Sequence, residues 1–96
     1  MTITTKQRAF LKGLAMKTDP IFQIGKSGIS EEIIKQLNAA LEARELIKVN
    51  VLASSPYTTA EAANFAADGT GALLVQVIGN KFVLYKESVK HKKIKL

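Results

Sequence analysis

The sequence predicts an α/β sandwich with the element order α-β-α-β-α-β-β and one mixed four-stranded sheet. Two patterns support this prediction. Apolar residues recur at helical spacing in three segments, and short apolar or alternating runs fall between and after these segments. The 96 residues fit one domain with a single modest core, so we expect residues 1–96 to form one unit with a frayed basic tail from about residue 86.

The first half of the chain predicts a helix, a short strand and a second helix. Residues 5–17 carry apolar side chains on one helical stripe, and Pro20 ends this helix. Residues 21–24 form a short apolar strand. Ser30 is a good N-cap for a second helix, and acidic residues follow it where the helix dipole favours them. The apolar stripe of this second helix comprises Ile33, Ile34, Leu37 and Leu41.

The middle of the chain predicts a strand and a third helix. Residues 46–52 alternate between apolar and polar side chains, which is typical of a strand with one buried face. Thr58 and Glu61 form a T-x-x-E capping box at the start of an alanine-rich helix. The segment Asp68-Gly69-Thr70-Gly71 ends this third helix, and Gly69 is suited to a left-handed C-cap.

The last two strands, residues 73–78 and 82–85, form a predicted hairpin. The pair Gly79-Asn80 between apolar runs indicates a tight turn, so these strands should be antiparallel. The first two strands flank a helix, and this order favours a parallel pair with a right-handed crossover. Both pairings together give the mixed sheet.

The aromatic residues indicate whether the chain could bind a nucleic acid by stacking its bases. The four phenylalanines, Phe10, Phe22, Phe65 and Phe82, stand in apolar patterns and are expected in the core. Tyr57 and Tyr85 are the candidates for exposed rings. No strand shows the paired aromatics on which RNA-recognition motifs stack bases, so recognition of backbone and shape is favoured.

Composition points to a polyanionic partner and away from catalysis. Fourteen Lys/Arg against eight Asp/Glu give a net charge of +6, although a lysine-rich solvated surface without a partner would look the same. The chain has no cysteine, and its one histidine, His91, lies in the tail. We therefore expect no enzyme activity, metal, cofactor or small-molecule substrate. Neither a signal peptide nor a membrane-length apolar run is present, so we expect a cytoplasmic protein without a membrane partner.

The loop Gly25-Lys26-Ser27-Gly28, called the GKSG loop below, is the strongest functional candidate. Its glycines allow a sugar-phosphate backbone to approach closely, Lys26 adds a charge, Ser27 adds a hydroxyl, and a helix N-terminus follows. The pattern of nucleotide phosphate loops requires glycine where this chain has Pro20. KH domains also clamp RNA with a GxxG loop, but there the loop joins two helices. An ordinary turn that needs a positive φ is the remaining alternative.

Certain chain segments resemble the CRM domain (chloroplast RNA splicing and ribosome maturation), particularly the stand-alone bacterial YhbY-like proteins. The segments are residues 11–15, 24–30, 40–49 and 75–85, and the resemblance extends from about residue 5 to 86. It implies a fold akin to the C-terminal domain of a bacterial translation initiation factor. It also implies RNA binding through the GxxG loop and an adjoining basic surface. Some relatives carry histidine where this chain has Ala43-Arg44.

These observations together predict a protein that binds structured RNA. For stand-alone bacterial members the resemblance implies association with precursors of the large ribosomal subunit, the pre-50S particles of ribosome biogenesis. A ribosome-associated adaptor that binds proteins and touches little RNA is the alternative. The predicted RNA contacts are the GKSG loop with Lys12, Arg44 and Lys48, followed by Lys17 and Lys81. The alternative for each is an ordinary solvated charge.

Overall fold

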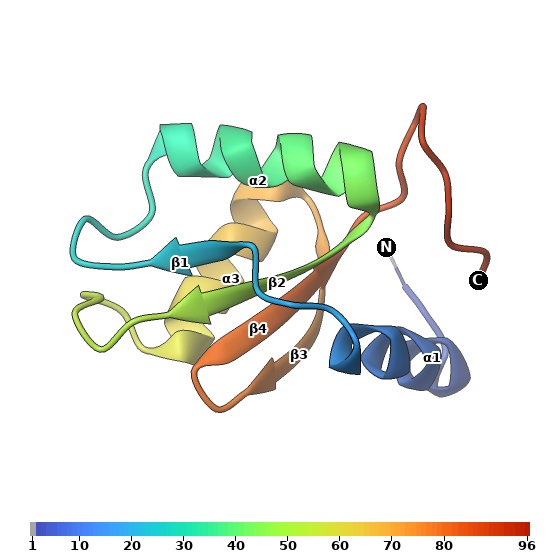
Figure 1. Cartoon of the computed structure of the whole chain (residues 1–96), viewed down its shortest axis with the longest axis horizontal. Coiled ribbons are helices and arrows are strands. Elements are labelled where there is room, and N and C mark those ends of the chain that lie inside the picture. Colours follow the sequence, from blue (N-terminus) through green and yellow to red (C-terminus); the bar gives the residue numbers. More distant parts are fainter. Residues whose placement is uncertain (1) are drawn as a thin grey trace.

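The computed structural model describes residues 2–96 and confirms the predicted element order (Figure 1). Met1 lies outside the described residues. The boundaries differ from the predicted ones by a residue or so at most ends. The elements are α1 (Thr5–Met16), β1 (Phe22–Ile24), α2 (Glu31–Arg44), β2 (Leu46–Val51), α3 (Thr59–Thr70), β3 (Leu73–Ile78) and β4 (Lys81–Tyr85).

The four strands form one mixed sheet in the order β1-β2-β4-β3. β1 runs parallel to β2, whereas β2 and β3 both pair antiparallel with β4, as predicted. The register places Ile24 opposite Val51 and Asn50 opposite Lys81. The pairing of β3 with β4 shifts register between Leu74 and Gln76.

Helices cover the two faces of the sheet unequally (Figure 1). α2 and α3 pack over one face, where Leu37, Leu41, Ile47, Phe82 and Leu84 belong to the main core. α1 packs on the other face through a smaller cluster of buried side chains, Leu11, Ala15, Leu46, Val75, Val83 and Tyr85. A single helix cannot cover a whole sheet face, so part of the α1 side is left open.

The helix starts match the predicted caps. Ser30 Oγ accepts from the N–H of Ile33 at 3.3 Å and caps α2. The predicted capping box of α3 is complete: Glu61 N–H donates to Thr58 Oγ1 at 3.1 Å, and Thr58 N–H donates to Glu61 Oε1 at 2.9 Å. These bonds satisfy amides that have no partner within the helix.

α3 ends within residues 68–71 as predicted, but the predicted left-handed C-cap at Gly69 is wrong. The helix continues to Thr70, and Gly71 is the left-handed cap, with φ 73°. Gly69 lies against α2 instead: a Cβ at this position would stand 2.6 Å from Cδ1 of Ile34. Glycine is therefore needed at position 69 for close packing of two helices, whereas position 71 needs it for the backbone turn.

Three of the six aromatic expectations are wrong. Phe82 is fully buried and Phe22 packs partly buried against the main core, as expected. Phe10 and Phe65, however, are 49% and 52% exposed. Tyr85 is buried rather than exposed, because β4 places it under α1.

Candidate nucleic-acid interface

The GKSG loop is a closed turn directly after β1. The N–H of Gly28 donates to the carbonyl oxygen of Gly25 at 3.0 Å, which closes a four-residue turn with Lys26 and Ser27 exposed at its tip. The N–H of Leu52 donates to the carbonyl oxygen of Ile24 at 2.9 Å. The base of the loop is therefore fixed to the sheet, while its tip stands in solvent.

The two glycines of the loop differ in why they are needed. Gly28 has φ 69°, and a Cβ there would lie 3.0 Å from Cε2 of Tyr57, so both backbone and space require glycine. A Cβ on Gly25 would lie 3.4 Å from Cδ1 of Leu52, an ordinary contact distance, and its φ is not positive. A side chain is therefore tolerated more easily at Gly25, whereas Gly28 fixes the direction in which the chain leaves the loop toward α2.

The electrostatics of the loop favour an anion at its tip rather than at the start of α2. Glu31 and Glu32 occupy the first turn of α2, where they already compensate the positive end of the helix dipole. Lys26 and Ser27 supply a cation, a hydroxyl and two main-chain N–H groups ahead of that turn. The turn itself is thus the anion site that this geometry supports.

The uncovered part of the sheet on the α1 side continues from the loop. Strand alternation and register place five polar side chains on this surface, named here the open sheet face. These five side chains are Gln23, Lys48, Asn50, Gln76 and Lys81. The four described strands contain no Asp or Glu, so no strand residue opposes the lysines of this face.

Three of the predicted cations converge on the open sheet face. Lys12 of α1 and Lys48 of β2 line the same small groove, which has a volume of about 60 Å³. Lys81 stands at the loop end of β4, opposite Asn50, and its Nζ donates to Oδ1 of Asn80 at 3.2 Å. Lys17, the exposed C-cap of α1, directly follows a residue that lines the groove.

Arg44 does not join this group. It lies in the last turn of α2, whereas the GKSG loop precedes the first turn. The 14 residues of α2 span about 20 Å at 1.5 Å per residue. Arg44 is exposed, and the end of α2 that carries it lies beside the C-terminal segment rather than the loop (Figure 1).

Several other cations serve the fold itself. The Nη1 of Arg8 donates to the carbonyl oxygens of Leu74 and Val75 at 2.9 and 2.6 Å, where β3 departs from regular pairing. The Nζ of Lys86 donates to the carbonyl oxygen of Thr70 at 2.6 Å, at the end of α3. The net charge of +6 therefore overstates the number of cations available to a ligand.

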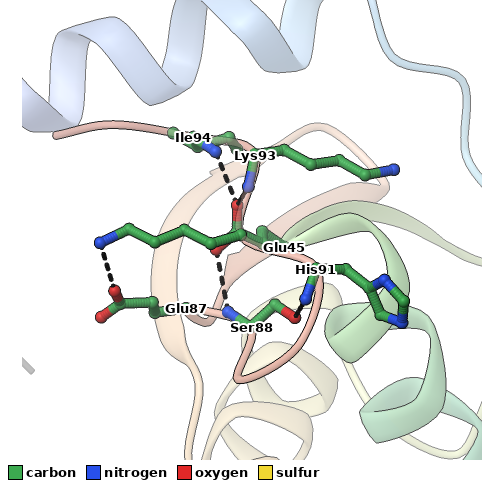
Figure 2. Close-up of polar contacts among 7 residues, drawn as sticks. Glu45, Glu87, Ser88, His91, Lys93 and Ile94 are labelled. Carbon is green, nitrogen blue, oxygen red and sulfur yellow. Dashed lines mark hydrogen bonds and ion pairs between the residues drawn. The ribbon is translucent and has the colours of Figure 1, made fainter.

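The tail after residue 86 is not frayed as predicted. Glu45, which is fully buried, accepts hydrogen bonds from the N–H groups of Ser88, Lys93 and Ile94 (Figure 2). The carboxylate distances are 2.9, 2.5 and 2.7 Å, respectively. Sequence reasoning missed this contact because the donors are main-chain groups, which any tail sequence would offer.

Glu42 holds the same tail one turn earlier in α2. It accepts hydrogen bonds from the Ser88 hydroxyl and from the N–H groups of Val89 and Lys90, and these contacts lower its pKa to about 2. Burial raises the pKa of Glu45, but the N–H donors of the tail outweigh burial and hold this pKa below its usual value. Both carboxylates are therefore charged at neutral pH and occupied within the molecule.

An aromatic pair lies beside the GKSG loop: Tyr57 is partly buried next to Gly28, and Phe65 is exposed. The rings of Tyr57 and Phe65 stand 4.9 Å apart with a tilt of 53°. Glu61 and Asp68, four residues before and three after Phe65, share its side of α3. These carboxylates oppose an approaching polyanion, so Phe65 is not part of the candidate interface, whereas Tyr57 supports the loop at Gly28.

Metal sites and membrane-spanning helices were also sought in the described part of the chain. Within residues 2–96, no group of three or more His, Asp or Glu side chains is placed to hold a metal ion. In the same part of the chain, none of the helices has the length and apolar character needed to cross a bilayer.

Over most of its length the chain is similar to proteins that are named as RNA-binding. The family model described as the CRS1 / YhbY (CRM) domain matches residues 3–86. A Bacillus subtilis protein named "Probable RNA-binding protein YqeI" is 48% identical over 98% of each chain. A Haemophilus influenzae protein named "RNA-binding protein" is 39% identical over 91% of this chain and 88% of its own. The solution structure of a Staphylococcus aureus protein, described as a candidate for RNA binding, has a TM-score of 0.80 and 48% identity over 99% of each chain.

Proposed function

Because the chain belongs to the CRS1 / YhbY (CRM) domain family, we propose that it binds structured RNA through the GKSG loop and the open sheet face. The observation that carries this proposal is the position of the loop. Its exposed tip, Lys26 and Ser27, lies at the end of a sheet face that holds lysines and no acidic residue. Such a surface fits the phosphates of an RNA strand, which dominate nucleic-acid affinity.

The two parts of the surface have different tasks in this proposal. The GKSG loop seats one phosphate with the Lys26 ammonium, the Ser27 hydroxyl and main-chain N–H groups, since a glycine turn lets the backbone come close. Lys12, Lys48 and Lys81 contact phosphates further along the strand, with Lys17 at the margin. Arg44 is an outlying contact, which only an RNA long enough to pass α2 reaches.

The proposed RNA is a precursor of the large ribosomal subunit in a cytoplasmic setting, and the protein performs no catalysis on it. The family resemblance supports the ribosomal precursor. The arrangement of cations supports RNA contact without chemistry, because catalysis needs a positioned and tuned acid or base. The titratable groups with clearly shifted pKa values cluster around the C-terminal tail, away from the proposed surface.

The test compares charge reversal in the GKSG loop with charge reversal at a lysine outside the proposed surface. Lys26→Glu should weaken binding to a structured ribosomal RNA fragment at least tenfold and should lower the salt dependence of binding. Each lost phosphate contact lowers the log–log salt slope by about 0.7–0.9. Lys6→Glu is the matched control, because it makes the same charge change near the start of α1, where a negative charge suits the helix dipole.

The adaptor alternative predicts a different outcome. A protein-binding adaptor would stay on ribosomal particles after complete RNase digestion, and Lys26→Glu would leave its binding unchanged. An RNA-binding protein would be released by RNase. If the affinity for the RNA fragment depended neither on salt concentration nor on the Lys26→Glu change, the proposed function would be wrong.

A further inference from the structure

The groove between α1 and the open sheet face has an apolar floor inside a basic rim. Met16, 84% exposed, and Ile78, 55% exposed, are apolar side chains that solvent reaches, and Val83 lies beneath them. Lys12 and Lys48 line the same groove. Apolar side chains exposed between cations are unfavourable in water unless a partner covers them.

Charge and shape restrict what this partner can be. The groove is lined by two lysines and the amide of Gln76, and no carboxylate lines it. An apolar protein segment would leave both ammonium groups without a counter-charge, whereas a nucleotide offers a flat apolar base face beside a phosphate. The groove is small, about 60 Å³, so a base would lie across it rather than be enclosed.

We propose that this groove binds one unpaired nucleotide of the RNA, with its base on Met16 and Ile78 and its flanking phosphates on Lys12 and Lys48. The inference rests on the proposed function and names a feature of its substrate. A base inside a helix is stacked on both faces, so only a bulged, looped or terminal nucleotide can offer one. The Gln76 amide donates to, or accepts from, the edge of that base.

Two hairpin RNAs test this inference. Their stems are identical, but one stem contains a single bulged nucleotide, which is replaced by the fluorescent base 2-aminopurine. The protein should bind the bulged hairpin about five- to tenfold more tightly than the paired one, because one base face leaves water on the groove. The fluorescence of the bulged base should change on binding.

The test variant combines Met16→Gln and Ile78→Thr. Both side chains are exposed, and the replacements suit a helix and a strand, so the fold should persist, which circular dichroism checks. This variant should lose the preference for the bulged hairpin and the fluorescence change, while its affinity for the paired hairpin stays within twofold. Val77→Thr is the matched control, since Val77 is exposed on the opposite face of β3.

The outcomes separate this inference from the proposed function. Lys26→Glu should weaken both hairpins equally. No preference for the bulge in the unchanged protein, or equal weakening of both hairpins by the double variant, would overturn the inference and leave the proposed function standing. Absence of salt-dependent binding to either hairpin would overturn both.

Discussion

The two ends of α2 each adjoin one residue with a positive φ, Gly28 at 69° before the helix and Glu45 at 66° after it. At the first end, the glycine turn leaves the Lys26 and Ser27 groups in solvent. At the second end, Glu45 turns its carboxylate inward, and three N–H groups of the tail surround it. The loop before α2 therefore leaves its main-chain N–H groups open to a ligand, whereas the carboxylate after α2 binds N–H groups of the tail within the molecule.

The difference teaches how one fold uses a positive φ in two ways. A sparsely populated backbone conformation of this kind costs a non-glycine residue roughly 1–3 kcal/mol. At position 28 a side chain has no space, and glycine avoids the cost. At position 45 the cost is offset by charge-assisted hydrogen bonds, which are stronger than neutral ones. The GKSG end is thus organised for a ligand, and the Glu45 end for stability.

Removal of the Glu45 carboxylate should have the largest effect. Glu45→Ala leaves three N–H donors without their acceptor and should lower the free energy of unfolding by about 3 kcal/mol. Glu45→Gly should recover about 1 kcal/mol of this loss, because glycine adopts φ 66° without strain. Urea unfolding followed by circular dichroism measures both. Arg44→Ala, one residue earlier and exposed, should stay within about 0.5 kcal/mol.

Gly28→Ala should destabilise the protein less than Glu45→Ala does, and it should also weaken RNA binding. A methyl group there meets Tyr57 at 3.0 Å and a φ of 69°, so the free energy of unfolding should fall by about 1–2 kcal/mol. RNA affinity should also fall, because the loop must shift. Gly25→Ala is the control, with its nearest contact at 3.4 Å. A larger stability loss for Gly25→Ala than for Gly28→Ala would contradict the two roles assigned to these glycines.

Acid should release the tail without first disrupting the sheet. The pKa of Glu42 is lowered to about 2 from its usual 4.5, so the stability that it contributes is fully present above about pH 4.5. This contribution is lost as the pH falls from there toward 2. Amide signals of Val89 and Lys90, followed by NMR, should change in this window, and Glu42→Gln should weaken the response. If the amide signals changed with a midpoint near pH 4.5, the contacts from the tail would not lower the pKa of Glu42, and this prediction would be wrong.

Charge reversal at Arg44 should have the smallest effect. Arg44→Glu should weaken the binding of a short structured RNA by less than threefold, because the residue lies about 20 Å from the GKSG loop. The same change at Lys26 should cost tenfold or more. Filter-binding titrations at two salt concentrations compare them. If Arg44→Glu lowered RNA affinity as much as Lys26→Glu does, the RNA-binding surface would have to include the end of α2 near the tail.

Local patterns were sufficient to predict most of the fold. Apolar periodicity, the Ser30 and Thr58 caps and the Gly79-Asn80 turn depend on near neighbours in the chain, and the structure confirms them. The end of α3 could not be chosen between Gly69 and Gly71, because the choice depends on Ile34 in another helix. Exposure of Phe65 likewise depends on how α3 lies against the sheet.

The candidate site was predicted in its parts but not in its grouping. The GKSG loop was visible as a motif, and strand alternation alone places Lys48 on the polar face of its strand. The convergence of Lys12 with Lys48 depends on the packing of α1, and the remoteness of Arg44 depends on the length of α2. The hydrogen bonds of Arg8 and Lys86 could not be predicted, because their acceptors are main-chain carbonyl oxygens, which every residue has.

Arg8 also affects how two copies of the protein can meet. β3 is an edge strand, and an edge with free carbonyl oxygens can pair with a strand from another molecule. The Arg8 guanidinium covers two consecutive carbonyl oxygens of this edge, at Leu74 and Val75, where the strand already departs from regular pairing. An intermolecular sheet therefore cannot extend through this stretch of β3 unless α1 first gives up its arginine contact.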